Sequence, residues 1–400
     1  MMAKIMKPEI KNPWYFEFLR YCIDDAQNPP VSANGIDWME MMDWAEQQAI
    51  VGVIYGGITD VRGQREDGRG KLQIPFDALM EWIGYGQEIE AQNKLVNQRC
   101  IEIVSSFQKD GLETCILKGQ GNAMMYPNPL LRTPGDIDVW SLTPNPSPKG
   151  EGNDVRHIIE YVRKKNPGAK AGYHHVEYGE FNGVEVEVHY RPTFMNNLIL
   201  NRKLQRWMDE HKDQQFHNHI NLPDTDGFVS VPTWEFNVVF QLTHIYRHVI
   251  QSGLGLKQVI DYYYLLRSDP RKRSITGTVP TDSLLCELGL MEIAGAVMWV
   301  LKEVLGMEER YLIAPVDERR GRFLLSEIMQ GGNFGMNGTQ KSRKPQKGCL
   351  AWPKWLSADT AIGRNILRLK RDVRLLRYFP SECLWEPIFR IYHFFWRLAH

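Results

Sequence analysis

Asp136-Ile137-Asp138-Val139-Trp140 carries two aspartates, two residues apart, in a short β-prone run. Because the side chains of a strand alternate between its two faces, both carboxylates are expected on one face. Neighbouring carboxylates repel each other unless a cation lies between them, and hard oxygen ligands suit Mg²⁺ or Mn²⁺. Two aspartates at this spacing also occur by chance, so the metal-site interpretation depends on what lies beside this strand.

A second β-prone run, Gly183–Tyr190 (GVEVEVHY), alternates strictly. Its three valines share one face, which we expect in the core, and Glu185, Glu187 and His189 share the other. A solvated edge strand would show the same pattern. If the run instead lies beside the first strand, one glutamate becomes a third carboxylate, and three carboxylates can hold the two metal ions used in phosphoryl transfer. Residues 174–177 are a possible hairpin partner for this run.

Lys118-Gly119-Gln120-Gly121 follows a third β-prone run, Glu113–Leu117, and precedes a short helical piece. Glycine lets the backbone approach a ligand closely, and a helix N-terminus offers free N–H groups to a phosphate. The spacing is not that of a P-loop. Arg132, four residues before the first aspartate, is placed to meet the same triphosphate. Isolated Lys and Arg side chains are more often surface charges, so Lys118 and Arg132 gain this interpretation from the carboxylates that they flank.

The chain of 400 residues divides by pattern into three regions. Residues 1–105 have the three- and four-residue apolar spacing of helices, as in Trp38–Gln48 and Phe76–Ile103. Residues 106–230 carry the strand runs and should form the catalytic core, with a Pro/Gly/Ser-rich exposed loop inserted at 141–153. Residues 231–400 are helical again. The expected fold class is therefore α+β, a small mixed β-sheet core with flanking helical regions.

Further helices are expected in the last region at Trp234–Gln251, Leu256–Leu266, Leu284–Leu305 and Ala361–Leu398. Polar, glycine-bearing loops are expected at 59–70 and 331–348.

Bulk composition excludes several classes of protein. Lys plus Arg and Asp plus Glu are both 48, so the net charge names no partner. The six cysteines contain no C-x-x-C pair, which suits a reducing compartment. The N-terminus lacks the features of a signal peptide, and the most apolar stretch, Leu290–Leu301, is too short to span a bilayer. We expect a soluble, cytoplasmic protein with no membrane partner.

Residues 340–377 form a basic segment. It holds eleven Lys and Arg against two Asp. A solvated helix face is the plainer interpretation, and a contact surface for the RNA backbone is the alternative. No base-stacking motif accompanies the segment.

The ordered set of motifs resembles the uncharacterised nucleotidyltransferase family within the DNA polymerase β-like superfamily. The motifs, in chain order, are Leu117-Lys118-Gly119, Tyr126-Pro127, Pro129, Arg132, Asp136-Ile137-Asp138, and Glu187 with His189. The resemblance covers roughly 114–190 and implies a small mixed sheet with helices packed on one side. One departure is that Lys118-Gly119 stands where the superfamily has a Gly-Ser pair, so a serine contact to phosphate would have to come from Lys118 or the backbone.

The resemblance also implies an activity: transfer of a nucleoside monophosphate from an NTP to an acceptor, with release of pyrophosphate. It makes Asp136, Asp138 and Glu187 the catalytic and metal-binding residues, with Mg²⁺ or Mn²⁺ as cofactor. Glu187 is preferred to Glu185 because the family's E-x-H pattern ends there. Lys118, Gly119, Gln120 and Arg132 would bind the triphosphate. The acceptor stays unidentified and could be a small molecule, a protein or RNA.

A second group of residues, His244, Arg247, His248, Lys257 and Asp261, resembles the helical part of the same family, which supplies a basic residue near the nucleotide. Lys257 is expected in that role, although a helix ion pair with Asp261 at i, i+4 would explain it equally. His244 and His248 share a helix face, but with no third ligand in sight we expect packed histidines and not a zinc site.

Three other functions remain open on this pattern. One is a catalytically degenerate nucleotide-binding or regulatory protein on the same scaffold. Another is a toxin-like transferase that modifies tRNA. The third is a metal-dependent phosphohydrolase, which would normally need more histidine ligands than His174, His175 and His189 supply.

Overall fold

The computed structural model describes residues 13–24, 35–59, 72–143, 152–269, 282–331 and 371–400. The expected loops at 59–70 and 331–348 lie almost entirely outside the described residues. So do most of the 141–153 insertion and most of the basic segment 340–377.

A four-stranded sheet forms the centre of the expected core. Its strands are β1 (Glu113–Ile116), β2 (Ile137–Leu142), β3 (His175–Phe181) and β4 (Val184–His189), in the order β1-β2-β4-β3. Strands β2 and β4 are parallel, and the two outer pairings are antiparallel. The valines of β4 are buried, as its alternation predicts. The small mixed sheet and the α+β class are therefore confirmed.

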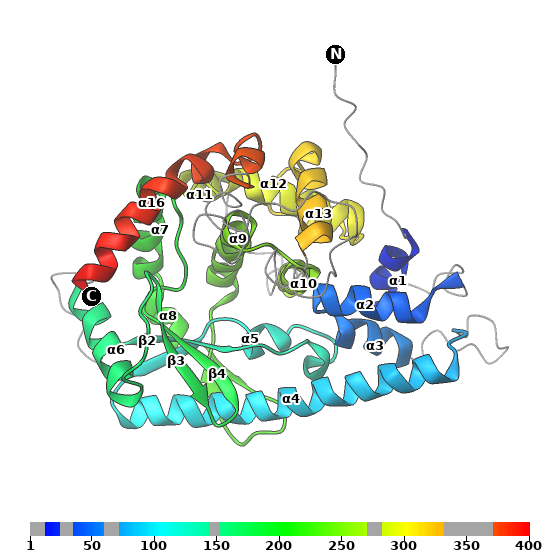
Figure 1. The fold of residues 1–400 in the computed structure, drawn as a ribbon, viewed down its shortest axis with the longest axis horizontal. Coiled ribbons are helices and arrows are strands. Elements are labelled where there is room, and N and C mark those ends of the chain that lie inside the picture. The colour runs from blue at the N-terminus through cyan, green and yellow to red at the C-terminus, as the bar shows by residue number, and fades with distance from the viewer. Residues whose placement is uncertain (1–12, 25–34, 60–71, 144–151, 270–281, 332–370) are drawn as a thin grey trace, which may run out of the picture.

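Two helices cover the apolar side of the sheet. Helix α4 (Phe76–Lys109) runs along the lower edge of the molecule in Figure 1, and α6 (Gly152–Lys165) lies near its far end. They share one hydrophobic cluster with the strands, which includes Phe107, Val139, Ile158 and Val188. Helix α4 ends past the expected region boundary at 105, and Gly111, at φ +80°, turns the chain into β1.

The other helices build a second, larger cluster. Helices α1 (Pro13–Ile23), α2 (Trp38–Gln48) and α3 (Val51–Thr59) come from the N-terminal region. Helices α9 (Trp234–Gln251), α10 (Leu256–Arg267), α12 (Met291–Trp299) and α13 (Glu318–Gly331) come from the C-terminal one. Residues of both regions belong to a single buried cluster. The three-part division along the sequence stays a prediction, but the two helical regions share one core.

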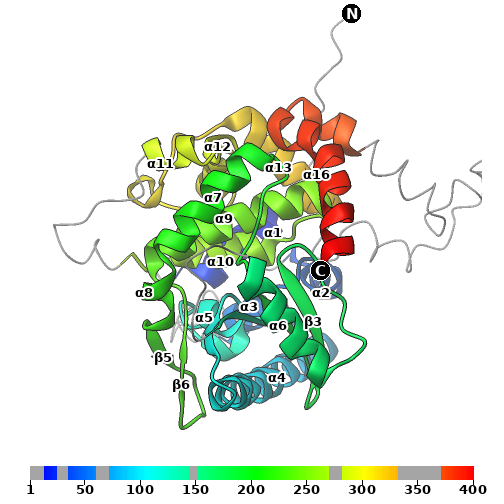
Figure 2. The same cartoon turned by 90° about the vertical axis from the view of Figure 1, so that its left-hand side faces the viewer.

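The remaining elements connect these two clusters. They are α5 (Gln120–Ala123), the 3₁₀ turns η3 (Pro129–Leu131) and η6 (Glu309–Tyr311), α7 (Leu198–Glu210), α8 (Lys212–Phe216), the hairpin β5 (His219–Asn221) and β6 (Phe228–Ser230), α11 (Asp282–Glu287), the π-helical turn η5 (Val300–Val304) and α16 (Pro380–Ala399). Figure 2 shows α7 to β6 descending along one side of the molecule.

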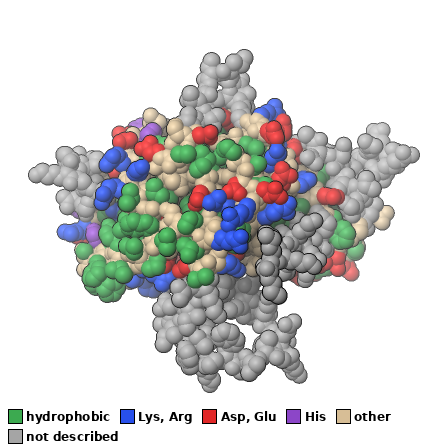
Figure 3. All heavy atoms as spheres, turned by 90° about the horizontal axis from the view of Figure 1, so that it is seen from above, with side chains coloured by type: hydrophobic (Ala, Val, Ile, Leu, Met, Phe, Trp, Pro, Cys, Tyr) green, Lys and Arg blue, Asp and Glu red, His purple; other side chains and the backbone are tan. Residues whose placement is uncertain are grey.

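Helix α16 descends along the upper left of the molecule in Figure 1 and contacts the sheet cluster through Phe389 and Trp396. Its other face exposes apolar side chains: Leu384, Ile388, Ile391, Phe394, Phe395 and Leu398. Figure 3 views the molecule from this side and shows hydrophobic side chains between groups of charged ones.

Three sequence-based boundaries are wrong. The expected insertion at 141–153 is too long, because β2 continues to Leu142 and α6 begins at Gly152. The expected helix Leu284–Leu305 is interrupted at Gly289, which has φ +69°. The expected helix Ala361–Leu398 does not run through, because a turn at 377–379 leads to Pro380 at the start of α16.

Candidate active site

The centre of the site is a pair of carboxylates on neighbouring parallel strands. Asp138 of β2 lies directly opposite Glu187 of β4 in the strand register. Asp138 is buried, at 2% exposed, and the side chain of Glu187 is 32% exposed. Asp136 is exposed and lies just before β2 begins. The parallel pairing that brings Asp138 and Glu187 together joins strands separated by α6 and β3, so it is a tertiary feature.

Both oxygens of the Asp138 carboxylate have cationic or donor partners. Lys118 Nζ donates to Oδ2 at 2.9 Å, and His189 Nε2 donates to Oδ1 at 2.8 Å. Burial alone would raise the pKa of Asp138, but Lys118 and His189 outweigh it and hold the pKa well below its usual range. The carboxylate is therefore ionised at neutral pH.

The other two carboxyl groups respond to Asp138 differently. The charge of Asp138, followed by burial, raises the pKa of Asp136. Burial and Asp138 would raise the pKa of Glu187, but contacts with His189 and His175 lower it overall. The Nδ1 atom of His175 is 3.3 Å from Glu187 Oε2. The negative charge of Asp138 thus destabilises the ionised form of Asp136, and a cation between the two aspartates would relieve this repulsion.

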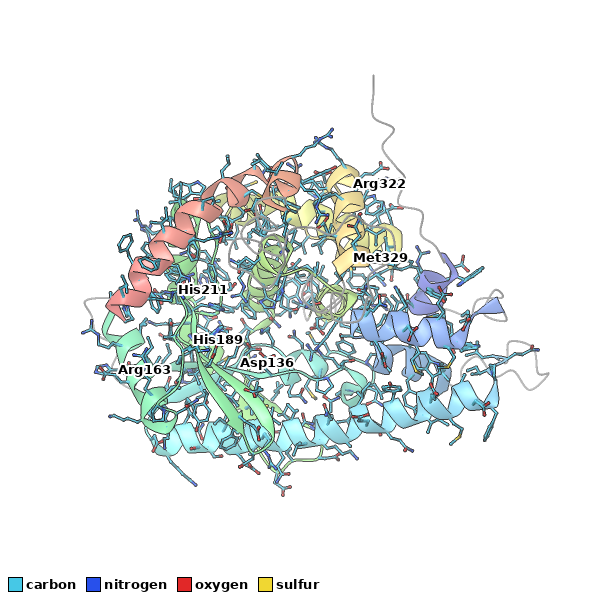
Figure 4. All side chains as sticks on the ribbon, viewed as in Figure 1. Asp136, Arg163, His189, His211, Arg322 and Met329 are labelled. Carbon is cyan, nitrogen blue, oxygen red and sulfur yellow. The ribbon has the colours of Figure 1, made fainter. Side chains whose placement is uncertain are left out.

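Figure 4 marks Asp136 and His189 in the middle of the molecule, between the sheet and α9.

Lys118 reaches Asp138 because of the turn after β1. The amide of Leu117 donates to the carbonyl of Asp138 at 3.0 Å, which extends the β1–β2 pairing to the edge of the site. The next residue but one, Gly119, has φ +56°, a conformation that favours glycine. A Cβ at Gly119 would meet only the Asp136 carbonyl, at 3.7 Å. The Lys118-Gly119 pair therefore lies against both aspartates.

Gln120 does not take the expected place beside a nucleotide. Its side chain is buried and its amide donates to Asn93 and Asn97 of α4. Asn122 continues this polar network to Asn237 of α9. A buried amide needs hydrogen-bond partners, and α4 supplies them, so Gln120 anchors α5.

Arg132 is likewise turned away from the expected triphosphate. It is 4% exposed and forms a two-pronged ion pair with Asp261 of α10, at 2.7 and 2.8 Å. Tyr126 also donates to Asp261, at 2.6 Å. The expected phosphate contact of Arg132 is corrected, because Arg132 fastens the turn before β2 to α10. The alternative ion pair between Lys257 and Asp261 is also wrong, since the partner of Asp261 is Arg132.

Replacing Arg132 with alanine should therefore act on stability. The change leaves Asp261 buried without its counter-ion, which costs about 3–5 kcal/mol in the free energy of unfolding. Lys94→Ala is the control, because Lys94 pairs with Asp224 at an exposed site and the loss there should be about 0–1 kcal/mol. Urea unfolding measures both. A stable Arg132→Ala protein that has lost ATP binding but keeps adenosine binding would restore the phosphate role.

Lys257, expected near the nucleotide, lies against the turn just before β2. Its Nζ is 3.5 Å from the carbonyl oxygen of Pro134 and 3.7 Å from the Cβ position of Gly135. Burial, followed by the charge of Arg132, lowers the pKa of Lys257 to about 7. Lys257 therefore supplies a positive charge next to Asp136 and forms no ion pair with a carboxylate among the described residues.

Five further residues around the carboxylates were not in the predicted site. Arg247 of α9 donates to His174 at 2.5 Å and lies over the Phe194 ring. His244 and His248 face each other, at 3.0 Å. Burial, then the charge of Arg247, lowers the pKa of His248 to about 3. His174 and His175 contact each other beside His189. The sequence showed His174, His175 and the run His244–His248, but it gave no sign that Arg247 of this run contacts His174.

The donor set fits a divalent cation. Ligand atoms of Asp138, Glu187 and His189 lie within 4.8 Å of one another. Each carboxylate oxygen has two lone pairs, so the contacts to Lys118 and His189 leave acceptor capacity at Asp138. The carboxylate oxygens of Asp138 and Glu187 suit Mg²⁺ and Mn²⁺.

A family model described as "Uncharacterised nucleotidyltransferase" matches residues 34–306. The match covers more than half of the chain, and the chain belongs to this family. The resemblance first seen in the motifs is thereby confirmed.

Comparison with solved structures adds little. The antigenic nucleotidyltransferase-like protein from Paracoccidioides brasiliensis is similar with 11% identity, over 58% of this chain and 96% of that one. The TM-score is 0.28, too low to support an argument. No curated protein matches the chain. Within the described residues, no helix is both long and apolar enough to cross a membrane.

Proposed function

We propose that this protein is a metal-dependent nucleotidyltransferase that moves a nucleoside monophosphate from an NTP to an acceptor and releases pyrophosphate. The observation that carries the proposal is the register of Asp138 against Glu187 on parallel strands, with Asp136 two residues before Asp138. Family membership supports the reaction class. Asp138 and Glu187 in register, with Asp136 electrostatically coupled to both, form the kind of carboxylate set that two divalent ions need for in-line phosphoryl transfer.

In this proposal Asp136, Asp138 and Glu187 would hold the ions, which would supply charge neutralisation for the triphosphate and activation of the attacking oxygen. The chain's own residues orient the ligands. His189 fixes the Asp138 carboxylate through its Nε2–H, and Lys118 holds the other oxygen. Glu187 is ionised and half-exposed, so it can accept the proton of an acceptor hydroxyl.

In this proposal, positively charged side chains near the carboxylates bind the phosphates. Lys118 is 19% exposed, so its ammonium group can reach both Asp138 and a ligand. Lys257 lies beside Asp136 from the helical side. Arg247 forms no ion pair with a carboxylate in the described part of the chain, and it is held between two histidines. A half-buried guanidinium without a counter-ion favours an anionic ligand.

Replacing Lys118 with alanine should weaken ATP binding by roughly ten- to a hundredfold, the worth of one charge-assisted contact. Adenosine binding should change much less, because adenosine has no phosphates. Titrations with both ligands measure this, and Lys94→Ala serves as the surface control. Equal losses for ATP and adenosine would place Lys118 outside the phosphate site.

Lys257 gives the site a pH dependence. Its pKa of about 7 means that it loses its proton as pH rises, although a bound triphosphate will raise that value toward the ordinary 10.5. ATP affinity of the wild type should fall between about pH 7 and about pH 10, and that of Lys257→Gln should fall less. Adenosine affinity should stay level in both proteins. Parallel pH profiles for wild type and variant would contradict the role.

An assay of pyrophosphate release tests which NTP is the donor and whether a metal ion is required. The protein is incubated with each NTP, with Mg²⁺, Mn²⁺ or chelator, and with fractions of cell extract that supply acceptors. We expect release that requires metal and an acceptor fraction. Release of phosphate without any acceptor would favour the phosphohydrolase, and NTP binding without turnover would favour the regulatory protein.

RNA stays among the candidate acceptors, but not every arginine of the basic segment 340–377 is available to contact it. Within its described part, Arg371 donates to the carbonyls of His248 and Val249, and Arg374 pairs with Glu327. These two arginines are engaged by the protein itself. Growth arrest on expression, relieved by Asp138→Asn, would support the toxin-like alternative.

A further inference from the structure

A cluster of three histidines lies next to the carboxylates and is not needed to bind Mg²⁺. One ring nitrogen each from His174, His175 and His189 lies within 4.8 Å of the others. His175 Nδ1 and His174 Nε2 are 3.0 Å apart. Two nitrogens bound to one zinc ion at about 2.0–2.1 Å are separated by roughly 3.3 Å, so this pair is already close to ligand spacing.

The backbone holds these histidines in place. His175 of β3 is paired with His189 of β4 in the strand register. The carbonyl of His174 accepts hydrogen bonds from the amides of Tyr190 and Arg191, at 3.1 and 3.2 Å. The three rings therefore come from one end of a hairpin, a rigid support of the kind that metal sites use.

A second observation points to a ligand. His189 is 1% exposed, and within the described part of the chain its Nδ1 atom has no hydrogen-bond partner. Buried polar atoms are almost always satisfied, so the unpartnered Nδ1 atom of this buried histidine needs an explanation. A metal ion bound by imidazole would supply one.

We propose that His174, His175 and His189 form a binding site for a borderline transition metal ion, with Zn²⁺ as the best fit, directly beside the carboxylates Asp138 and Glu187 that would hold Mg²⁺. Three imidazole ligands suit Zn²⁺ and Co²⁺ and do not suit Mg²⁺. Three protein ligands also leave a fourth position for water or substrate, as in catalytic zinc sites. Binding needs no nucleotide, so the proposal stands apart from the transferase assignment.

Arg247 competes with the ion. Its guanidinium donates to His174 Nε2, one of the nitrogens that would bind the metal. An ion would have to displace this contact against the repulsion of a neighbouring positive charge. Removing the guanidinium should therefore tighten metal binding. A cluster held together by hydrogen bonds alone predicts no such gain.

Co²⁺ is the probe, because it replaces Zn²⁺ and absorbs visible light when tetrahedrally coordinated. The full chain is stripped with a chelator and titrated with Co²⁺ in the presence of excess Mg²⁺. We expect one bound ion per chain that Mg²⁺ does not displace. His174→Gln and His175→Gln should each weaken binding at least tenfold, and Arg247→Leu should strengthen it several-fold.

His248→Gln is the matched control, since His248 also faces a second histidine but belongs to no three-ligand group among the described residues. Its affinity for Co²⁺ should equal that of the wild type. Thermal unfolding of every variant shows whether it folds. If His174→Gln and His175→Gln do not fold, the comparison of Co²⁺ affinity between Arg247→Leu and His248→Gln tests the proposal.

Absence of a visible band in the wild type would overturn the proposal. So would equal losses in His248→Gln and His175→Gln, or a band that Asp138→Asn abolishes and His175→Gln leaves unchanged. The last result would place the ion at the carboxylates.

Discussion

Asp138→Asn is expected to abolish nucleotidyl transfer, with a loss of at least a thousandfold, on the order of 4 kcal/mol in the barrier. Asparagine keeps the shape of the side chain but removes the charge that lies between Lys118, His189 and the expected metal ions. Transfer is measured with labelled NTP under saturating Mg²⁺ or Mn²⁺. An Asp138→Asn protein with full metal-dependent activity would remove Asp138 from the site.

The same variant should also lose stability. Repulsion between clustered like charges would by itself predict an intact or slightly more stable fold for this variant. The structure reverses this prediction, since Asp138 is buried and neutralised by Lys118 and His189. We expect a loss of about 1–3 kcal/mol in the free energy of unfolding.

The pH dependence checks that stability effect. The pKa of Asp138 is lowered in the folded state, so its contribution is present above the unfolded value of about 3.9 and disappears as pH falls below it. The difference between wild type and Asp138→Asn should therefore shrink in acid. A difference that persists unchanged in acid would point to a packing defect.

Glu187→Gln should reduce transfer nearly as severely, whereas Glu185→Gln should be mild. Both glutamates lie on the same face of β4, and the sequence left the choice to a resemblance. The structure supports Glu187, which lies opposite Asp138, while Glu185 is exposed and paired with Glu180. Glu185→Gln is thus the matched control on the same strand. Transfer rates of the two variants are compared at equal folded concentration, and the reverse ranking would move the third carboxylate to Glu185.

Local patterns predicted the elements well. The helices Trp38–Gln48 and Trp234–Gln251 begin and end where their apolar spacing indicated. The strict alternation of 183–190 predicted β4 and its buried valines. Alternation fixes which side chains share a face, and it is a property of the strand alone, so no tertiary information was needed.

The partners of charged side chains could not be predicted in the same way. Arg132 is four residues before Asp136, but its guanidinium pairs with Asp261, 129 residues further along the chain. Gln120 follows a glycine in a phosphate-like turn, yet it is buried against α4. Burial of a polar group depends on which helix packs over it, and that packing is decided across the whole fold.

The histidines show the same limit. His174, His175 and His189 were visible near the carboxylates in the sequence, but only the hairpin register shows that their rings meet. Arg247 reaches His174 from α9, more than fifty residues after β4, and also contacts His244 of its own helix. No pattern within a single element carries this information.

The central claim is tested most directly by following the label of ATP and the other NTPs in parallel reactions with cell extract and Mn²⁺. The phosphorus is labelled in the α position in one reaction and in the γ position in the other. We predict that an acceptor takes up the α label and that the γ label is recovered as pyrophosphate. With Asp138→Asn in place of the wild type, neither product should form. Transfer of the γ label to an acceptor, or α-label transfer that survives in Asp138→Asn, would contradict the account.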